Sequence, residues 1–245
     1  MKIPKSHPRY ESLKVRHRLV DGLQAGYVTE SGLIAHGRGE AFDYLLGERT
    51  IAAAAAAEKA AVAALLLAKR PVISVNGNTA ALVPDGLVAL AKAVGAKLEI
   101  NLFYRTEERE KLIAAILKRA GANSVLGVGD GMKKLSGIDS ERARADPEGI
   151  WVADVVLVPL EDGDRAEALA EAGKLIISVD LNPLSRTSQA AAVPIVDNVV
   201  RAIPNMIRLA EKMKSLEKVA LEMVLDDFDR EKCLSDAISI VRKGV

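Results

Sequence analysis

Cysteine and histidine are scarce in this chain of 245 residues, and their scarcity restricts the chemistry open to it. The single cysteine, Cys233, excludes an intrachain disulfide and any metal site built from several cysteines. The three histidines, His7, His17 and His36, are not spaced as a metal-ligand set. Cys233 lies in a helical pattern far from the other polar clusters, so we expect a structural thiol rather than a nucleophile. The sequence predicts no metal site made by the protein.

Aromatic residues make up 3% of the chain, and 34 basic side chains are balanced by 33 acidic ones. So few rings argue against a base-stacking surface for nucleic acid, and a net charge of +1 predicts no general attraction to nucleic acid or membranes. The N-terminus lacks the apolar core of a signal peptide. The most apolar segment, 51–68, contains Glu58 and Lys59, whose charges are costly in a bilayer. We therefore expect a core helix there and a soluble cytoplasmic protein.

Three familiar motifs are also absent. The chain has no Gly-x-Ser-x-Gly elbow, which argues against covalent nucleophilic catalysis by serine. It has no Walker A loop and no Gly-x-Gly-x-x-Gly after a first strand, and the second absence argues against a dinucleotide oxidoreductase.

Apolar runs alternate with helical patterns along most of the chain. Strands are predicted at 72–78, 97–103, 124–128, 152–160, 175–180 and 191–196, and helices at 10–25, 84–94, 107–120, 199–213, 215–226 and 230–242. This order predicts an α/β, Rossmann-like three-layer fold with a mostly parallel sheet. We expect one domain over 1–245, with a helical N-terminal part (1–70), a sheet core (71–200) and added C-terminal helices (201–245).

Polar residues directly follow four of the predicted strands. They are Asn76 with Asn78, Asn101 with Arg105, residues 161–165, and residues 180–187. Because parallel strands point the same way, these groups should meet at one edge of the sheet, where ligands bind in open α/β folds. Each turn alone has a local explanation, but four on one edge predict a binding site.

The last of these turns follows a run typical of a strand buried on both faces. Asp180 could accept from ribose hydroxyls, and Arg186 with Thr187 near a helix start could hold phosphate. The alternative is a turn at Asn182-Pro183 with Ser185 or Thr187 as the helix N-cap.

The other turns leave similar alternatives open. Asn76 and Asn78 could bind a substrate or adopt the left-handed conformation of a tight turn. The carboxylates of residues 161–165 could hold Mg²⁺ or an amine, or could be ordinary acids at a helix N-terminus. Thr106 is a predicted N-cap, with Arg109 where a capping box has Glu or Gln. The polar residues 132–149 are expected to be irregular and mobile.

Glycines flank an arginine in residues 32–44. Gly37 and Gly39 surround Arg38 just after His36. Glycines let a backbone approach a ligand and direct N–H groups at an anion. We therefore expect a glycine-rich turn before a helix at 40–46, with His36 and Arg38 as donors; the alternative is a turn with an exposed arginine.

Several long strings resemble the archaeal phosphopantothenate synthetase family, the 4-phosphopantoate–β-alanine ligase of coenzyme A biosynthesis. They are Ile3–Tyr10, Gly32–Leu45, Val75–Asn78, Pro159–Arg165, and Asp180–Thr187 with Val196–Asn198 after it. The resemblance extends from the N-terminus to about Pro204.

The resemblance implies ATP-dependent condensation of (R)-4-phosphopantoate with β-alanine to 4'-phosphopantothenate, releasing AMP and diphosphate, in a homodimer. We further hypothesise that Mg²⁺, with Arg38 and Arg186, neutralises the polyphosphate of ATP. By similarity, ATP would be held by Arg16, Arg38, Asp180, Leu181, Asn182, Arg186, Thr187 and Asn198. We hypothesise that Arg38 and His36 are catalytic. The residues expected to contact phosphopantoate are His36, Asn76, Asn78 and Arg105. The β-alanine ammonium or the metal would be held by Glu161, Asp162 and Asp164, with Arg165 as a further substrate contact. The alternative is a non-catalytic nucleotide-binding regulatory protein on the same fold.

Overall fold

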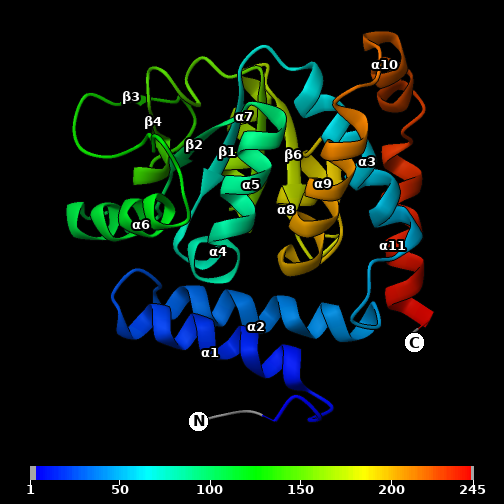
Figure 1. Ribbon diagram of the computed structural model, residues 1–245, viewed down its shortest axis with the longest axis horizontal. Helices are drawn as coiled ribbons and strands as arrows, with labels where there is room; N and C mark the ends of the chain where they lie inside the picture. The colour runs from blue at the N-terminus through cyan, green and yellow to red at the C-terminus, as the bar shows by residue number, and fades with distance from the viewer. Residues whose placement is uncertain (1–3, 244–245) are drawn as a thin grey trace.

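Five parallel strands form the central sheet of the computed structural model, which describes residues 4–243; Ile3 of the first family string therefore lies outside the described residues. The strands are ordered β2-β1-β5-β6-β7. Their bounds are Pro71–Val75 for β1, Lys97–Ile100 for β2, Val155–Pro159 for β5, Leu175–Val179 for β6 and Val193–Ile195 for β7. The predicted α/β, Rossmann-like fold is confirmed (Figure 1).

The strands send alternate side chains into two hydrophobic cores. Ile73, Leu157 and Ile177 are aligned by the strand register and lie in the larger core. That core also includes residues of α3 (Ala52–Leu67), α5 (Pro84–Val94) and α9 (Val199–Met213). The neighbouring row Val72, Val156 and Ile176 faces the other way, toward α7 (Gly163–Glu171). Since both rows are buried, the near-continuous apolar runs of these strands are explained.

The C-terminal helices α10 (Lys218–Asp226) and α11 (Arg230–Lys243) pack against α3, and α11 also contacts β7. They therefore cover the flank of the sheet. Within residues 4–243, no helix combines the length and the apolar character that a bilayer span requires.

Helices α1 (Tyr10–Gln24) and α2 (Glu30–Leu45) lie outside these layers. In Figure 1 they run below the sheet, next to α4 (Gly77–Leu82), which directly follows β1. Helix α2 therefore lies beyond the carboxyl ends of the strands. Asp43 is its one buried residue.

The predicted glycine-rich turn at residues 32–39 is wrong, because this segment belongs to α2. The side chain of Thr29 caps the helix by accepting from the Gly32 N–H at 3.2 Å. Gly32 is needed for close packing, since a Cβ there would lie 2.5 Å from Oδ1 of Asn78. The glycines cost helix propensity, about 1 kcal/mol each, and Thr29 and this packing offset part of that cost.

A predicted strand at 124–128 is also wrong. Only Leu126 bridges β2, through Glu99. Gly127 has φ +78°, and a Cβ there would overlap the carbonyl oxygen of Ile100. The chain therefore turns away after one bridge. The following segment 132–149 is not wholly irregular, because it contains β3 (Lys133–Lys134), the 3-10 turn Glu141–Ala143 and β4 (Arg144–Ala145).

Several helix ends follow local capping rules, and the predicted N-cap at Thr106 is confirmed. Gly95 caps α5 in the left-handed conformation, and the side chain of Thr106 caps α6 (Glu107–Arg119). Ser185, rather than Thr187, caps α8 (Arg186–Ala190). Asn76 caps α4 with φ −117°, so the left-handed alternative for this residue is wrong.

One carboxyl group is buried on α3, beside the larger hydrophobic core. Glu58 of α3 is 2% exposed and accepts from Nδ2 of Asn205 at 3.1 Å. Burial raises the pKa of Glu58 to about 7, and the nearby Asp197 adds to this rise. Because the folded pKa exceeds the ordinary value of 4.5, stability from this group is greatest below pH 4.5 and is lost as the pH rises toward 7.

We expect Glu58→Gln to stabilise the protein at pH 8 by roughly 2–3 kcal/mol and to flatten the pH dependence between 5 and 8. Glutamine keeps an oxygen for Asn205 without a buried charge. Urea denaturation at pH 5 and pH 8 measures both effects, with the exposed Glu171→Gln as control. An unchanged pH slope in Glu58→Gln would contradict this account.

Candidate active site

A cleft of about 900 Å³ lies between α2 and the loops that follow the strands. Strand β1 connects outward to β2, whereas β5 leads the other way to β6 and β7. The neighbouring strands β1 and β5 thus form the switch point at which open α/β folds bind ligands. Three of the four expected groups of strand-end residues line this cleft, whereas Asn101 and Arg105 do not. The cleft is lined by His36, Arg38, Asn76, Asn78, Glu161, Asp162, Asp164, Arg165, Asp180, Leu181, Asn182, Arg186, Thr187 and Asn198.

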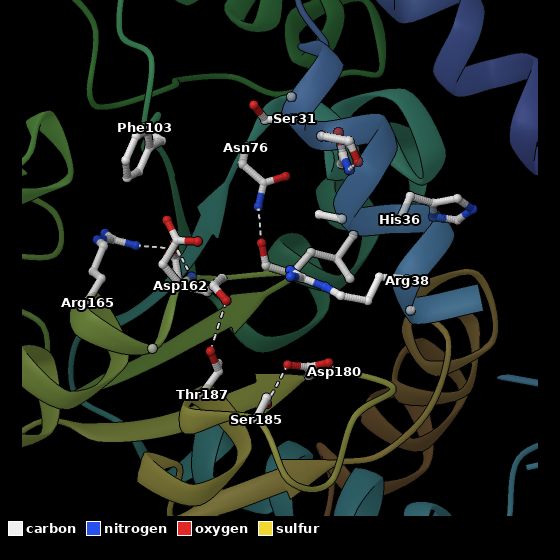
Figure 2. A pocket seen from close by; sticks show the side chains of 18 of the residues that line it. Ser31, His36, Arg38, Asn76, Phe103, Asp162, Arg165, Asp180, Ser185 and Thr187 are labelled. Carbon is white, nitrogen blue, oxygen red and sulfur yellow. Dashed lines mark hydrogen bonds and ion pairs between the residues drawn. The ribbon is translucent and has the colours of Figure 1, made fainter. Parts of the chain in front are cut away.

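The turn after β6 is held by its own polar side chains. Asp180 accepts from the Ser185 hydroxyl at 2.6 Å and from the Asn182 N–H at 3.0 Å. Ser185 in turn accepts from the N–H of Ser188. Burial raises the pKa of the Asp180 carboxyl, and hydrogen bonds and the charge of Arg38 oppose that rise. The capped turn is therefore present, and the same turn faces the cleft (Figure 2).

Helix α2 supplies the facing wall. Ser31, Ala35, Arg38 and Phe42 line the cleft at the spacing of one helix face. In Figure 2 the Arg38 side chain extends from α2 over the strand-end side chains. Among residues 4–243 it has no carboxylate partner within ion-pair distance. Its charge is available to an anionic ligand.

The imidazole of His36 points away from Arg38 in Figure 2. Its Nε2 is buried without a hydrogen-bond partner in the described part of the chain. Burial lowers the pKa of His36, so its neutral form is favoured near pH 7.

Two predicted site residues lie outside the cleft. Arg16 of α1 forms an ion pair with Glu40 of α2 at 3.0 Å. Arg105 forms an ion pair with Glu110 and donates to the Gly127 carbonyl at 2.7 Å. Both guanidinium groups are therefore occupied by partners elsewhere in the subunit.

The carboxylates of residues 161–165 are matched by arginines. Glu161 is buried between Arg142 and Arg165, and it pairs with both. Asp162 lies 2.7 Å from Nε of Arg142, and its side chain is half exposed.

The last acid of this segment, Asp164, pairs with Arg186 at the cleft edge. Arg186 also donates to Glu167 at 2.9 Å. The acids do lie around the start of α7, where Asp162 is the N-cap residue, but they are neutralised by arginines rather than by the helix alone.

Two arginines of the cleft were missed by sequence reasoning. Arg142 comes from the irregular segment 132–149, whose backbone is held when Nδ2 of Asn101 donates to the carbonyls of Arg142 and Arg144. Arg109 comes from the first turn of α6. The sequence signal that could have drawn attention to Arg109 was its position in a predicted capping box. Arg142 carried no such signal.

Asn198 is held by a buried polar network. Its Nδ2 donates to Asp43 at 2.8 Å, and its Oδ1 accepts from the Val200 N–H. Arg201 donates to both carboxylate oxygens of Asp43 and also pairs with Asp197. This network joins α2 to the start of α9, directly beside the cleft.

The described residues offer few groups for binding a metal ion or for thiol chemistry. Within the described residues, no group of three or more His, Cys, Asp or Glu side chains could hold a metal ion. Cys233 is buried, and burial raises the pKa of its thiol to about 11. Its predicted structural role agrees with this protonated state.

Comparison with known proteins gives a consistent family match. The phosphopantothenate/pantothenate synthetase family model matches residues 53–244. A 4-phosphopantoate–β-alanine ligase of Thermococcus kodakarensis is 54% identical over 241 residues, covering 98% of this chain and 92% of the relative. The protein of the same name from Methanosarcina mazei is 52% identical, covering 98% of this chain and 94% of the relative.

We expect Asp43→Ala to lower the free energy of unfolding by about 2–4 kcal/mol, because it removes a buried partner of Arg201 and Asn198. A double-mutant cycle with Arg201→Ala, followed by urea denaturation, should give a coupling energy above about 1 kcal/mol. The exposed Asp21→Ala on α1 is the matched control. Purely additive losses would show that the pair does not anchor α2.

Proposed function

Because the chain belongs to the phosphopantothenate/pantothenate synthetase family, we propose that it is a 4-phosphopantoate–β-alanine ligase of coenzyme A biosynthesis. It would condense (R)-4-phosphopantoate with β-alanine to 4'-phosphopantothenate and convert ATP to AMP and diphosphate. The observation that carries this proposal is the conjunction of near-full-length relatives of that name with a cleft of cationic and hydroxyl side chains at the sheet switch point.

A carboxylate is a poor electrophile until one of its oxygens becomes a leaving group. In the proposed first step, the phosphopantoate carboxylate attacks the α-phosphorus of ATP, which forms an acyl-adenylate and releases diphosphate. The β-alanine amine then attacks the acyl carbon, AMP leaves, and the amine loses a proton as the amide forms. Such chemistry needs positioning and charge neutralisation more than a protein nucleophile.

The nucleotide is assigned to the side of the cleft formed by the β6 turn and α2. Arg38 supplies an uncompensated charge for the polyphosphate, and Asp180 supplies a carboxylate for the ribose hydroxyls. Arg186 is exposed, and it can exchange Asp164 for a phosphate at modest cost because exposed ion pairs are weak. Leu181, Asn182, Thr187 and Asn198 complete this proposed ATP site.

The acid and the amine are assigned to the neighbouring part of the cleft. Asn76, Asn78 and His36 are proposed to contact phosphopantoate. Asp162, whose side chain is half exposed, is the best-placed acceptor for the β-alanine ammonium, whereas Glu161 is enclosed by arginines. Asp164 and Arg165 line the same part of the cleft and are proposed to flank these substrates.

Arg16 and Arg105 receive less support as direct ligands. Arg16 supports the site within one subunit through its pair with Glu40 on α2. Contact between Arg16 and ATP would have to come across the interface of the proposed homodimer. Arg105 would act through Glu110 and the Gly127 loop, with which it pairs.

Mg²⁺ is part of the proposal as the ion that accompanies ATP. It typically keeps several waters and uses substrate phosphates with only one or two carboxylates. The exposed Asp164 satisfies that modest requirement, although the described residues offer no three-carboxylate cage. A homodimer in the cytoplasm, acting on small molecules, completes the proposed assignment.

We expect AMP to appear only when ATP, Mg²⁺, phosphopantoate and β-alanine are present together, in step with the amide product. Omitting each acid in turn, with chromatographic detection of AMP and 4'-phosphopantothenate, provides the measurement. ATP binding without AMP under any combination would reject the ligase and favour the regulatory protein.

Arg38→Ala should lower kcat/KM for ATP by roughly 10²- to 10³-fold, because it removes charge neutralisation at the polyphosphate. Arg70→Ala, at the amino end of β1 on the opposite edge of the sheet, should leave this value within about twofold, as expected of a surface change. Unchanged nucleotide affinity and turnover in Arg38→Ala would remove the phosphate assignment.

A further inference from the structure

Five arginines line the cleft in the described part of the chain: Arg38, Arg109, Arg142, Arg165 and Arg186. Arg142, Arg165 and Arg186 each pair with a carboxylate. Arg38 and Arg109 have no such partner within residues 4–243. Arg109 is partly buried and therefore needs a counter-charge, whereas Arg38 is exposed at the cleft. The cleft thus offers two separate places for anionic groups.

The Arg109 guanidinium is held by backbone carbonyls rather than by acids. Nη2 donates to the Tyr27 carbonyl at 3.0 Å, and Nη1 donates to the Tyr104 carbonyl. These carbonyls orient the planar group without neutralising it. The buried Nε has no partner among the described residues, and each terminal nitrogen keeps a second N–H. A fork of donors with a fixed direction therefore remains available.

The surroundings of Arg109 increase its need for an anion. Burial lowers the pKa of Arg109, and the positive charge of Arg142 lowers it further. Gly77 leaves room for the guanidinium, because a Cβ there would lie 3.2 Å from Nη2 and would overlap the Tyr27 carbonyl oxygen. An arriving anion would relieve the repulsion between the two arginines.

The two uncompensated arginines are separated across the sheet. Arg38 is close enough to Asp180, after β6, to influence its charge. Arg109 follows β2 and lies beside Gly77, directly after β1. In the order β2-β1-β5-β6-β7, these are opposite sides of the switch point. A ligand that presents one anionic end to the nucleotide and a second to Arg109 fits this arrangement.

We propose that Arg109 binds the phosphate of the acid substrate and thereby selects 4-phosphopantoate over unphosphorylated pantoate. The inference rests on the proposed function. Phosphopantoate carries its phosphate at the end opposite the carboxylate that must meet ATP, whereas β-alanine keeps its carboxylate close to its reacting amine. A phosphate monoester carries close to two negative charges at pH 7 and accepts bidentate bonds from an arginine fork.

The test is equilibrium binding measured by calorimetry without turnover. The ligands are 4-phosphopantoate and pantoate, and the proteins are wild type, Arg109→Gln, Arg109→Lys and the control Arg119→Gln. Arg119 lies at the exposed end of the same helix and outside the cleft. Arg109→Gln should weaken phosphopantoate binding roughly 10- to 100-fold and leave pantoate binding unchanged. Arg109→Lys should give a smaller loss, and Arg119→Gln none.

A purely structural role of Arg109 would weaken both acids alike, and that result would overturn the proposal. Selective loss of β-alanine affinity, measured as a rise in its KM, would also overturn it and would assign Arg109 to the other carboxylate. ATP-induced thermal stabilisation of each variant checks that the fold is intact. If wild type binds phosphopantoate through Arg109 but forms no amide, the ligase assignment fails and the Arg109 assignment stands.

Discussion

One buried carboxylate anchors helix α2 to the start of α9. Asp43 is the single buried residue of this helix, and it bonds both Arg201 and Asn198. A helix held by apolar packing would bury a stripe of side chains. A helix held by a charged network instead has its register fixed by hydrogen-bond geometry. The wall that carries Arg38 is thereby aligned with the loop that carries Asn198.

Charge balance organises the cleft behind that wall. Glu161 is shared by Arg142 and Arg165, so the irregular segment 132–149 and the start of α7 are joined at a buried point. Glu99 adds a second attachment, because its carboxylate accepts from the N–H groups of Asp146 and Ile150. Burial raises the pKa of Glu99 to about 7. These paired charges shape the site, while Arg38 and Arg109 have no carboxylate partner within the described residues.

The sequence was sufficient where a local rule decides the structure. Apolar runs predict the five strands of the sheet, and Thr106 is predictable as a cap because capping depends on neighbouring backbone groups. The predicted helix at 40–46 covers only the end of α2, because its earlier glycines favour a turn by local rules, whereas Gly32 serves a contact with Asn78, far along the chain. The meeting of strand-end residues followed from parallel topology, but the pairing of Arg105 away from the cleft depends on Glu110 and the Gly127 loop and could not be predicted.

The pairing of β1 with β5 has a consequence for folding. Val72 meets Val156 across a sequence separation of more than eighty residues, so this pair can form only after a long loop closes. Parallel sheets with such distant pairings fold slowly. The cleft opens at this same junction, so a ligand can bind only a chain in which the pair has formed. By mass action, a ligand bound there would stabilise the chain in which β1 and β5 are paired over the chain in which they are separated.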